Sequence, residues 1–580
     1  MSSPPGAFCL VLHTHLPYVL GHSTWPHGAN MLYEAAAECY LPLLEVFRRL
    51  ADDGIMARTS VSLTPVVVEQ LADDRFKEWF GHYLTDRVET AEANAGEFRY
   101  RGDLHLAYLA ERWSRHYRHL QGLYHEELGR DIVGAFRDLQ DRGAVELMTS
   151  GATHGYLPLL YEDASIQAQI RQAVTSYQRH FGRFPRGFWL PECAYRPRTA
   201  WAPPAEVQAP DGHTWWRKGL EEFLGENGLD YFIVDTHMLG RSGDPLPVDI
   251  HYHDSLGKLW GRITRREERP RPSWEKTTFW PYFVGSHFEE HPPVACLVRN
   301  EEISYQVWSA EFGYPGDGWY LEFHRKHMPG DHRYWRITDD RNDLGTKDAY
   351  SPEMAQERLR EQAGHFVGLL HDTLEGQPRP FGRRPVACVP FDAELFGHWW
   401  HEGPAWLEQV IRWIHEDPRL QCMSCGEYLA DTAPSTAITL PEGSWGAGGG
   451  HYIWLNDNTT WSWRRIFQAE RRMQHLARTF AHREDEQLQA FLRQAGRELL
   501  LLQASDWQFL ISTHGAPDYA AHRLVAHHTD FNHVAELAER WARQDCLSDE
   551  DWQYFGSLCG RDDIFEDIDP GWWREVHYPA

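Results

Sequence analysis

Gly187-Phe188-Trp189-Leu190-Pro191-Glu192-Cys193-Ala194-Tyr195 sets one carboxylate directly after a proline, at the end of a short apolar run with aromatic residues on both sides. This pattern is typical of the end of a buried strand, where the chain leaves the sheet. An acid among aromatic rings suits a site that cleaves sugars, because rings stack on pyranose faces and a carboxylate attacks the anomeric carbon. A glutamate that only caps the following helix would give the same local pattern, so this stretch alone leaves both readings open.

Other apolar runs along the chain also end in polar residues. Phe8 to Leu12 leads into His13 and His15, and further strands are predicted at 57–67, 145–149, 229–235, 384–390 and 420–423. Helical patterns separate them at 32–50, 76–139, 164–181 and 352–374. Alternating strands and helices indicate a parallel α/β fold, in which reactive residues collect at the carboxyl ends of the strands.

The alternation of predicted strands and helices, and the places where it is interrupted, divide the chain into four parts. Residues 1–195 and 229–429 form a catalytic barrel in two pieces, and 196–228 form a small inserted subdomain with several prolines and a helix at 216–224. The pattern turns helical over 430–580. Within the barrel, residues 237–294 are irregular and rich in Gly, Pro, His and aromatic residues, and we expect a functional loop there.

Composition excludes several classes of protein. The 580 residues carry a net charge of −27, which argues against nucleic acid or an anionic membrane as a partner. No apolar run reaches the roughly 18 residues of a membrane span, and no signal peptide is evident. Nine scattered cysteines favour reduced thiols in a cytoplasmic protein. The 26 tryptophans exceed what packing needs, and carbohydrate sites are one common use for them.

A second acid lies at a distant strand end. Pro390-Phe391-Asp392-Ala393-Glu394 follows the strand predicted at 384–390. A retaining glycosidase needs two carboxyl groups about 5–5.5 Å apart, one as nucleophile and one as acid/base. Glu192 is one candidate. Either Asp392 or Glu394 can be the other, because residues two apart on a strand share a face.

The histidines permit a different chemistry. His13 and His15 at the end of the first strand, together with His154 and Asp392, suit a divalent-metal hydrolase. The same histidines can instead be neutral hydrogen-bonding groups for sugar hydroxyls. A serine or cysteine nucleophile is disfavoured, because no GxSxG motif occurs and Cys193 has no evident His partner in the sequence.

The motifs together resemble those of the family 57 glycoside hydrolases, and within that family the 1,4-α-glucan branching enzymes. The resemblance covers nearly the whole chain. It is carried by 13–18 (HTHLPY), 151–158 (GATHGYLP), 187–192 (GFWLPE), 390–399 (PFDAELFGHW), 311–317 (EFGYPGD) and 505–507 (SDW). It implies an incomplete (β/α)7 barrel, similar to a TIM barrel, with a small inserted domain and a C-terminal α-helical domain that closes over the cleft.

The resemblance also assigns roles. It implies Glu192 as nucleophile and Asp392, rather than Glu394, as acid/base, with no metal and no other cofactor. The residues that it implies around the glucan are His13, His15, Trp25, His154, Trp308, Trp445, Trp454 and Asp506. For Trp445 and Trp454, packing between the barrel and the helical domain is an equal alternative.

The activity implied is transfer of an α-1,4-glucan chain to a sugar 6-hydroxyl, which makes an α-1,6 branch on amylose, amylopectin or glycogen. Branching members carry a loop with a tyrosine that shields the intermediate from water, and Tyr252 in the segment 237–294 is the candidate here. That segment looks longer than usual for the group, so the ratio of transfer to hydrolysis stays open. An α-glucan hydrolase or a 4-α-glucanotransferase on the same site is the alternative. We expect a monomer.

Overall fold

The computed structural model describes residues 5–207, 214–240, 276–285, 293–309, 312–339, 341, 343–379, 383–435, 437–574 and 576. The description that follows concerns these residues.

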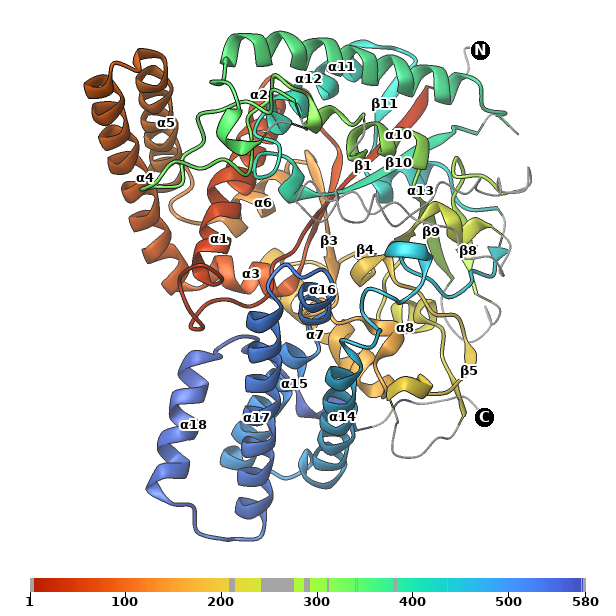
Figure 1. The fold of residues 1–580 in the computed structure, drawn as a ribbon. Coiled ribbons are helices and arrows are strands. Elements are labelled where there is room, and N and C mark those ends of the chain that lie inside the picture. Colours follow the sequence, from red (N-terminus) through yellow and green to blue (C-terminus); the bar gives the residue numbers. More distant parts are fainter. Residues whose placement is uncertain are drawn as a thin grey trace.

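Seven parallel strands form the centre of the molecule (Figure 1). In spatial order they are β10 (Val386–Asp392), β1 (Gly6–Thr14), β2 (Thr59–Leu63), β3 (Val145–Ser150), β4 (Gly187–Trp189), β7 (Tyr231–Val234) and β9 (Val294–Val298). Between β9 and β10 the described chain has an isolated bridge from Arg299 to Cys388 in place of a named ladder. The predicted incomplete (β/α)7 barrel is therefore confirmed.

The strands form because their apolar runs are covered on both faces. All nine residues of β1 are buried, as expected for the middle of a parallel sheet. Its register sets His13 opposite Asp392 on β10 and opposite Ser62 on β2. Short strands extend the sheet: β8 (Tyr282–Val284), β11 (Leu420–Cys422) and β12 (Ala437–Ile438).

Helices surround the barrel and pack on it through one apolar side. They are α1 (Ala29–Ala35), α2 (Leu41–Asp52), α3 (Pro65–Ala72), α6 (Ile132–Asp141), α7 (Asp163–Phe181), α8 (Leu220–Glu226), α10 (Glu301–Trp308), α11 (Pro352–Glu375), α12 (Gly403–Glu416) and α13 (Cys425–Asp431). Two further helices, α4 (Asp74–Arg101) and α5 (Leu104–Gly122), form a hairpin that projects at the upper left of Figure 1. Gly102, with φ of 86°, ends α4 and makes the tight reversal possible.

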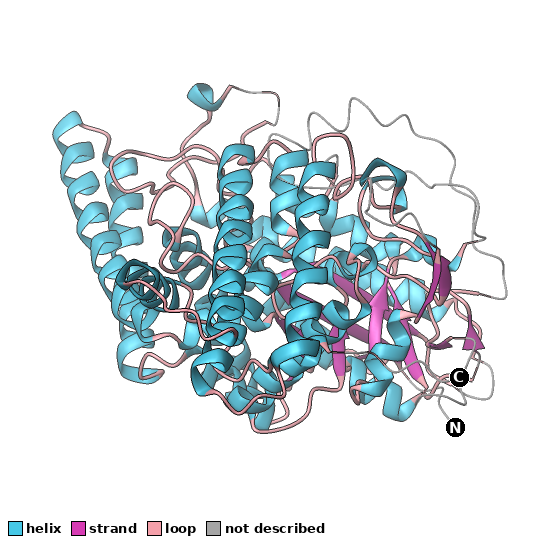
Figure 2. Cartoon of the chain, turned by 90° about the horizontal axis from the view of Figure 1, so that it is seen from below, coloured by secondary structure: helices cyan, strands magenta, loops and turns pink. Residues whose placement is uncertain are grey.

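The C-terminal part is helical, as the sequence predicted. It contains α14 (Thr460–Phe480), α15 (Glu486–Leu502), α16 (Asp506–Ser512), α17 (Pro517–Ala542) and α18 (Asp549–Arg561). These helices lie at the bottom of Figure 1, and Figure 2 shows long helices on one side of the molecule and the strands on the other. The short helix α16 lies beside the barrel and starts at Asp506.

One local prediction was wrong. The helix predicted at 216–224 begins at Leu220, because Trp215–Arg217 form β6, which pairs with β5 (Thr199–Trp201) in an antiparallel ribbon. Residues 306–308 end helix α10, whose first turn is capped by the Asn300 side chain accepting from Ile303 N at 3.1 Å. Of the irregular segment 237–294, residues 241–275 and 286–292 lie outside the described residues.

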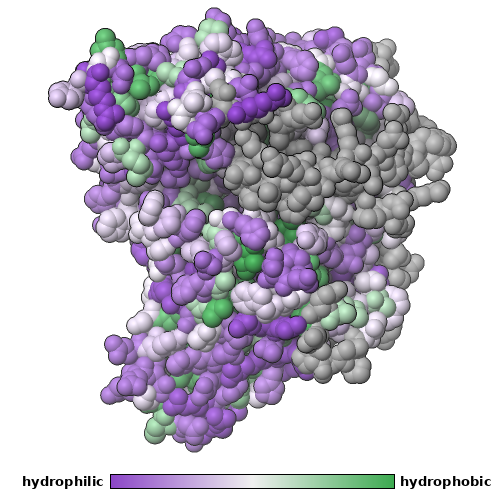
Figure 3. All heavy atoms as spheres, in the orientation of Figure 1, coloured by the Kyte–Doolittle hydropathy of each residue, from purple (hydrophilic) through white to green (hydrophobic). Residues whose placement is uncertain are grey.

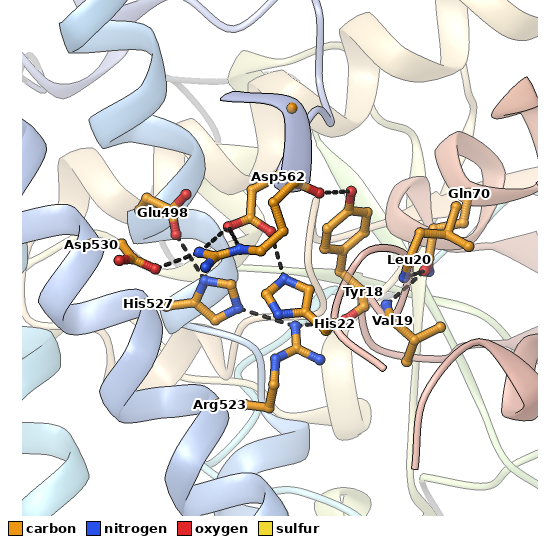
Figure 4. A network of polar contacts seen from close by, with 12 residues as sticks. Tyr18, Val19, Leu20, His22, Gln70, Glu498, Arg523, His527, Asp530 and Asp562 are labelled. Atoms are coloured by element: carbon orange, nitrogen blue, oxygen red, sulfur yellow. Dashed lines mark hydrogen bonds and ion pairs between the residues drawn. The ribbon is translucent and has the colours of Figure 1, made fainter. Parts of the chain in front are cut away.

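A buried polar network joins the helical part to the loop after β1 (Figure 4). The Arg523 guanidinium of α17 donates to the Tyr18 carbonyl at 2.7 Å and to His527 Nε2 at 3.1 Å. From the loop, His22 Nε2 lies 2.5 Å from Asp562 Oδ1. Because Val19 N also donates to Gln70 Oε1 at 2.7 Å, the loop is held from both the barrel and the helices.

The acids of this network are matched by guanidinium groups. His527 Nδ1 lies 2.8 Å from Glu498 Oε2, and Arg561 donates to both Asp562 and Asp530. Glu498, His527 and Asp562 form the group of described residues whose spacing would suit a metal ion. Since Arg523 and Arg561 already contact this group, it serves as an ionic joint between the loop and the helices.

The face of the molecule in Figure 3 is mostly hydrophilic, with hydrophobic side chains in small separate groups. Within the described residues, every helix is either too short or too polar to span a membrane.

Candidate active site

Chemically active side chains meet at the carboxyl ends of the parallel strands. β1 contributes His13 and, just beyond its end, His15. The segment after β3 contributes His154, and Glu192 follows β4. β10 ends with Asp392, which is opposite His13 in the register. The start of α16 adds Ser505 and Asp506 to this group. The strand ends thus bring together His13, His15, His154, Glu192 and Asp392, which are far apart in the sequence.

Glu192 has an unusual backbone. Its φ of 60° and ψ of 26° lie in the left-handed region, which costs a non-glycine residue roughly 1–3 kcal/mol and is found mostly at functional sites. The strained turn is held by the segment before α14. Trp445 N donates to the Glu192 carbonyl at 3.1 Å, and Tyr195 pairs with Gly443 through two backbone hydrogen bonds.

The Glu192 carboxylate receives a donor on each oxygen. Trp445 Nε1 donates to Oε2 at 2.8 Å, and Ser505 Oγ donates to Oε1 at 3.3 Å. His154 Nδ1 lies 3.8 Å from the same Oε1. Burial raises the pKa of Glu192 to about 7, although these hydrogen bonds oppose the shift; the charge of Asp506 adds to it. The carboxyl group can therefore be ionised near neutral pH.

Two rows of side chains connect β2 to the start of α16. In the first row, His13 Nδ1 lies 3.1 Å from Ser62 Oγ, and His13 Nε2 lies 3.1 Å from His154 Nε2. His154 Nδ1 is 3.0 Å from Ser505 Oγ, which reaches Glu192. Burial lowers the pKa of both histidines well below its usual value, so both imidazoles are neutral.

The second row runs parallel to the first. His15 Nδ1 lies 3.3 Å from Thr64 Oγ1, and His15 Nε2 lies 2.9 Å from Asp506 Oδ2. The rings of His15 and His154 stack with centroids 4.0 Å apart, so the two rows pack on each other. All three histidines therefore have hydroxyl, carboxylate or imidazole partners within the protein.

The structure separates the two candidate acids on β10. Glu394 accepts a hydrogen bond from the buried Tyr40 hydroxyl at 2.7 Å. Asp392 accepts no hydrogen bond from the described residues. Burial raises its pKa well above the usual range, and the charges of Glu394 and Glu192 add to the shift, while Arg299 opposes it. Burial therefore favours the protonated form of Asp392, whereas Glu192 receives donors that favour its ionised form.

The aromatic candidates fall into three classes. Trp445 contacts Glu192 and packs edge-on against Trp189, which itself stacks on His13. Trp25 is 68% exposed on the loop after β1 and Trp308 is 7% exposed beside Phe391. Trp454 is 1% exposed and stacks on Tyr156, so its contacts favour a packing role between the barrel and the helical part. Tyr252 lies outside the described residues.

Sequence reasoning missed several residues of this edge. Ser62 and Ser505 complete the first row, and only the position of Ser505 next to Asp506 could have pointed to it. Asp235, directly after β7, was passed over although an acid at a strand end is the signal used for Glu192. Arg299 Nη1 lies 3.7 Å from Asp235 Oδ1. Burial raises the pKa of Asp235, but other effects, of which the Arg299 charge is the largest, lower this pKa to about 2.

Comparison with known proteins places this geometry in a family. A model described as glycosyl hydrolase family 57 matches residues 9–441, and a model described as 1,4-alpha-glucan branching enzyme, C-terminal, matches residues 465–573. The 1,4-alpha-glucan branching enzyme TK1436 of Thermococcus kodakarensis is 39% identical over 97% of this chain and 78% of its own length.

Solved structures agree over the full length. The crystal structure of TK1436 in complex with glucose and additives superposes with a TM-score of 0.87 at 38% identity, covering 99% of this chain and 97% of that one. The branching enzyme of Pyrococcus horikoshii gives 0.86 at 36%, with coverage of 99% and 98%. The α-amylase AmyC of Thermotoga maritima gives 0.78 at 26%, with coverage of 99% and 100%. The chain belongs to glycosyl hydrolase family 57.

Proposed function

We propose that the protein is a 1,4-α-glucan branching enzyme in which Glu192 is the nucleophile and Asp392 the acid/base. The observation that carries this proposal is the contrast between the two carboxyl groups at the carboxyl ends of β4 and β10. Glu192 is supported in its ionised form by hydrogen-bond donors on both oxygens, whereas Asp392 accepts no hydrogen bond from the described residues and its burial favours the protonated form. A nucleophile and a general acid need opposite protonation states at the same pH.

The chemistry follows from these states. Asp392 gives its proton to the leaving glycosidic oxygen while the Glu192 carboxylate attacks the anomeric carbon and forms a covalent glycosyl-enzyme. Asp392 is then a base, and it removes the proton of the incoming hydroxyl. When that hydroxyl is the 6-OH of another glucan, the product is an α-1,6 branch with retained anomeric configuration.

An α-glucan such as amylose, amylopectin or glycogen would approach over the aromatic residues. Trp445 lies against the nucleophile. We assign Trp25 to the glucan path because it is exposed on the loop after β1, and Trp308 because it lies beside Phe391, the neighbour of Asp392. His13, His15, His154 and Asp506 would contact or position the sugar next to Glu192. Tyr252 is proposed as the tyrosine that shields the intermediate. Trp454 is the weakest member of this set, because its ring is enclosed by packing.

Hydrolysis is the second candidate activity. AmyC, named as an α-amylase, covers the full chain with a TM-score of 0.78, so this fold is compatible with water as the acceptor. The ratio of hydrolysis to branching depends on how well water is excluded from the covalent glycosyl-enzyme. A 4-α-glucanotransferase activity would need the 4-hydroxyl of the acceptor glucan, rather than its 6-hydroxyl, to attack the glycosyl-enzyme.

The deciding experiment uses amylose as substrate. Free reducing ends are counted after incubation, and counted again after a debranching enzyme has opened the α-1,6 linkages. Few ends before debranching and many after it establish branching; many ends before and no rise after it establish hydrolysis. Glu192→Gln and Asp392→Asn should each remove the activity. Glu394→Gln should leave the ratio of branching to hydrolysis unchanged. An active Glu192→Gln variant contradicts the assignment.

We further propose that the protein works as a monomer in the cytoplasm. None of its nine cysteines is paired in a disulfide, as a reducing compartment requires. A monomer suffices because the helical part of the same chain supplies Ser505 and Asp506 to the site. Sedimentation analysis of the purified protein tests the oligomeric state.

A further inference from the structure

In the row that starts at Ser62 and ends at Glu192, the donor and the acceptor of every hydrogen bond can be assigned. Four contacts of 3.0–3.3 Å join five side chains: Ser62, His13, His154, Ser505 and Glu192. Glu192 can only accept when ionised, so the Ser505 hydroxyl must donate to it. Each remaining proton in the row then has one possible position.

The argument runs backwards from Ser505. Because its hydroxyl proton points to Glu192, its oxygen accepts from His154 Nδ1, which must carry a hydrogen. A neutral imidazole has one N–H, so His154 Nε2 is bare and accepts from His13 Nε2. His13 Nδ1 is then bare as well, and it accepts from the hydroxyl of Ser62. Every donor in the row therefore points towards Glu192.

The opposite direction breaks the contact with the acid. If Ser62 accepted from His13 Nδ1, then His13 Nε2 would be bare and His154 Nε2 would carry the hydrogen. His154 Nδ1 would then accept from Ser505, and the Ser505 hydroxyl proton would no longer be available to Glu192. In the direction that serves Glu192, the Ser62 hydroxyl on β2 is the first donor of the row, and it supplies the hydrogen that the bare His13 Nδ1 accepts.

We propose that Ser62 is a positioning residue for catalysis, which orients the His13–His154 pair so that Ser505 donates to the nucleophile. This inference rests on the proposed function, because it treats Glu192 as the reacting group. Chains of hydrogen bonds aligned in one direction polarise one another, so the buried row strengthens the last bond to the carboxylate. The helical part of the protein closes the row, and Ser505 N is itself fixed to the His154 carbonyl at 3.2 Å.

The neighbouring row provides a matched control. Thr64 lies two residues beyond Ser62, has the same burial and makes the same kind of contact, a hydroxyl to a histidine Nδ1. Its row ends on Asp506 instead of Glu192. Removing the hydroxyl of Ser62 should therefore change the behaviour of the nucleophile, and removing the hydroxyl of Thr64 should not.

The test measures the first chemical step alone. An activated α-glucosyl fluoride labels the nucleophile covalently, and its fluoride leaves without a proton from Asp392. The rate of labelling, followed by protein mass spectrometry with the labelled peptide identified, is recorded against pH for the full-length wild type and for Ser62→Ala, Ser62→Thr and Thr64→Val. The midpoint of the acidic limb reports ionisation of Glu192 and does not depend on how much protein is folded.

Ser62→Ala is expected to move that midpoint upward by about 0.5–1 pH unit, the equivalent of one hydrogen bond. Below the midpoint, labelling should slow about three- to tenfold. Ser62→Thr, which keeps the hydroxyl, should restore the wild-type midpoint, and Thr64→Val should leave it in place. Equal shifts in Ser62→Ala and Thr64→Val, or no shift in Ser62→Ala, would overturn the inference. Absence of label on Glu192 in the wild type at every pH would instead overturn the proposed nucleophile.

Discussion

Replacing Glu192 by Gln should make the protein more stable at alkaline pH and have little such effect at acidic pH. The folded protein holds the Glu192 carboxyl with a pKa of about 7, against an ordinary value of 4.5, chiefly because the group is buried. A raised carboxyl pKa means that folding favours the protonated form. The unfavourable contribution to stability is therefore absent below about pH 4.5, grows as pH rises, and is complete above about pH 7.

The size of the effect follows from the two pKa values. They differ by about 2.5 pH units, which corresponds to about 3 kcal/mol at 1.36 kcal/mol per unit. Most of it develops between pH 5 and pH 8. Gln cannot ionise, so the variant lacks this term. It also loses one of the two donors to Glu192, since an amide has one acceptor oxygen, but that loss is the same at both pH values and cancels from the comparison.

Urea denaturation at pH 5 and pH 8 measures the difference. The gain of the variant over the wild type should increase by about 2–3 kcal/mol from the lower to the higher pH. Glu322→Gln is the control whose effect should be nearly equal at the two pH values: burial raises the pKa of Glu322, but hydrogen bonds from His324 and the charge of Lys347 bring it to about 2, so its stabilising contribution is already almost complete at pH 5. That wild-type carboxylate stabilises above its unfolded pKa. A Glu192→Gln gain that is equal at both pH values would refute the reasoning.

Three further outcomes are expected. Trp445→Phe removes the indole donor that stabilises ionised Glu192, so the acidic limb of kcat/KM against pH should move up by about 1–2 units. Asp506→Asn removes a negative charge that raises the pKa of Glu192, so the same limb should move down, and an upward shift would contradict the electrostatic argument. Arg523→Met leaves the Tyr18 carbonyl and His527 Nε2 without their buried guanidinium partner. It should destabilise the protein by about 3–5 kcal/mol, measured by calorimetry against the exposed Arg419→Met variant.

The barrel and the two principal acids could be predicted because their signal is local in the sequence. A continuous apolar run such as Phe8 to Leu12 forms a buried parallel strand wherever the rest of the chain covers it, and the residue after it must then lie at the carboxyl edge. Glu192 and Asp392 both follow such runs, and the structure brings both to that edge. The same logic would have found Asp235.

The remaining parts of the site depend on contacts that the sequence does not encode locally. Ser505 reaches Glu192 across 313 positions, and Ser62 reaches His13 across 49. The choice between Asp392 and Glu394 depends on the Tyr40 hydroxyl, 354 residues from Glu394. The helix predicted from Trp216 failed because pairing with β5 outweighed the local helical preference.

The position of Ser505 and Asp506 has a consequence for biosynthesis. Ribosomes make the chain from its N-terminus, so the barrel residues 6 to 431 leave the ribosome long before the helix that carries these two side chains. Until that helix docks, Glu192 lacks one of its donors and His15 lacks its acid. A nascent barrel therefore has its carboxyl pair without a finished site. The site is therefore completed only after the C-terminal helices have been made and have docked on the barrel.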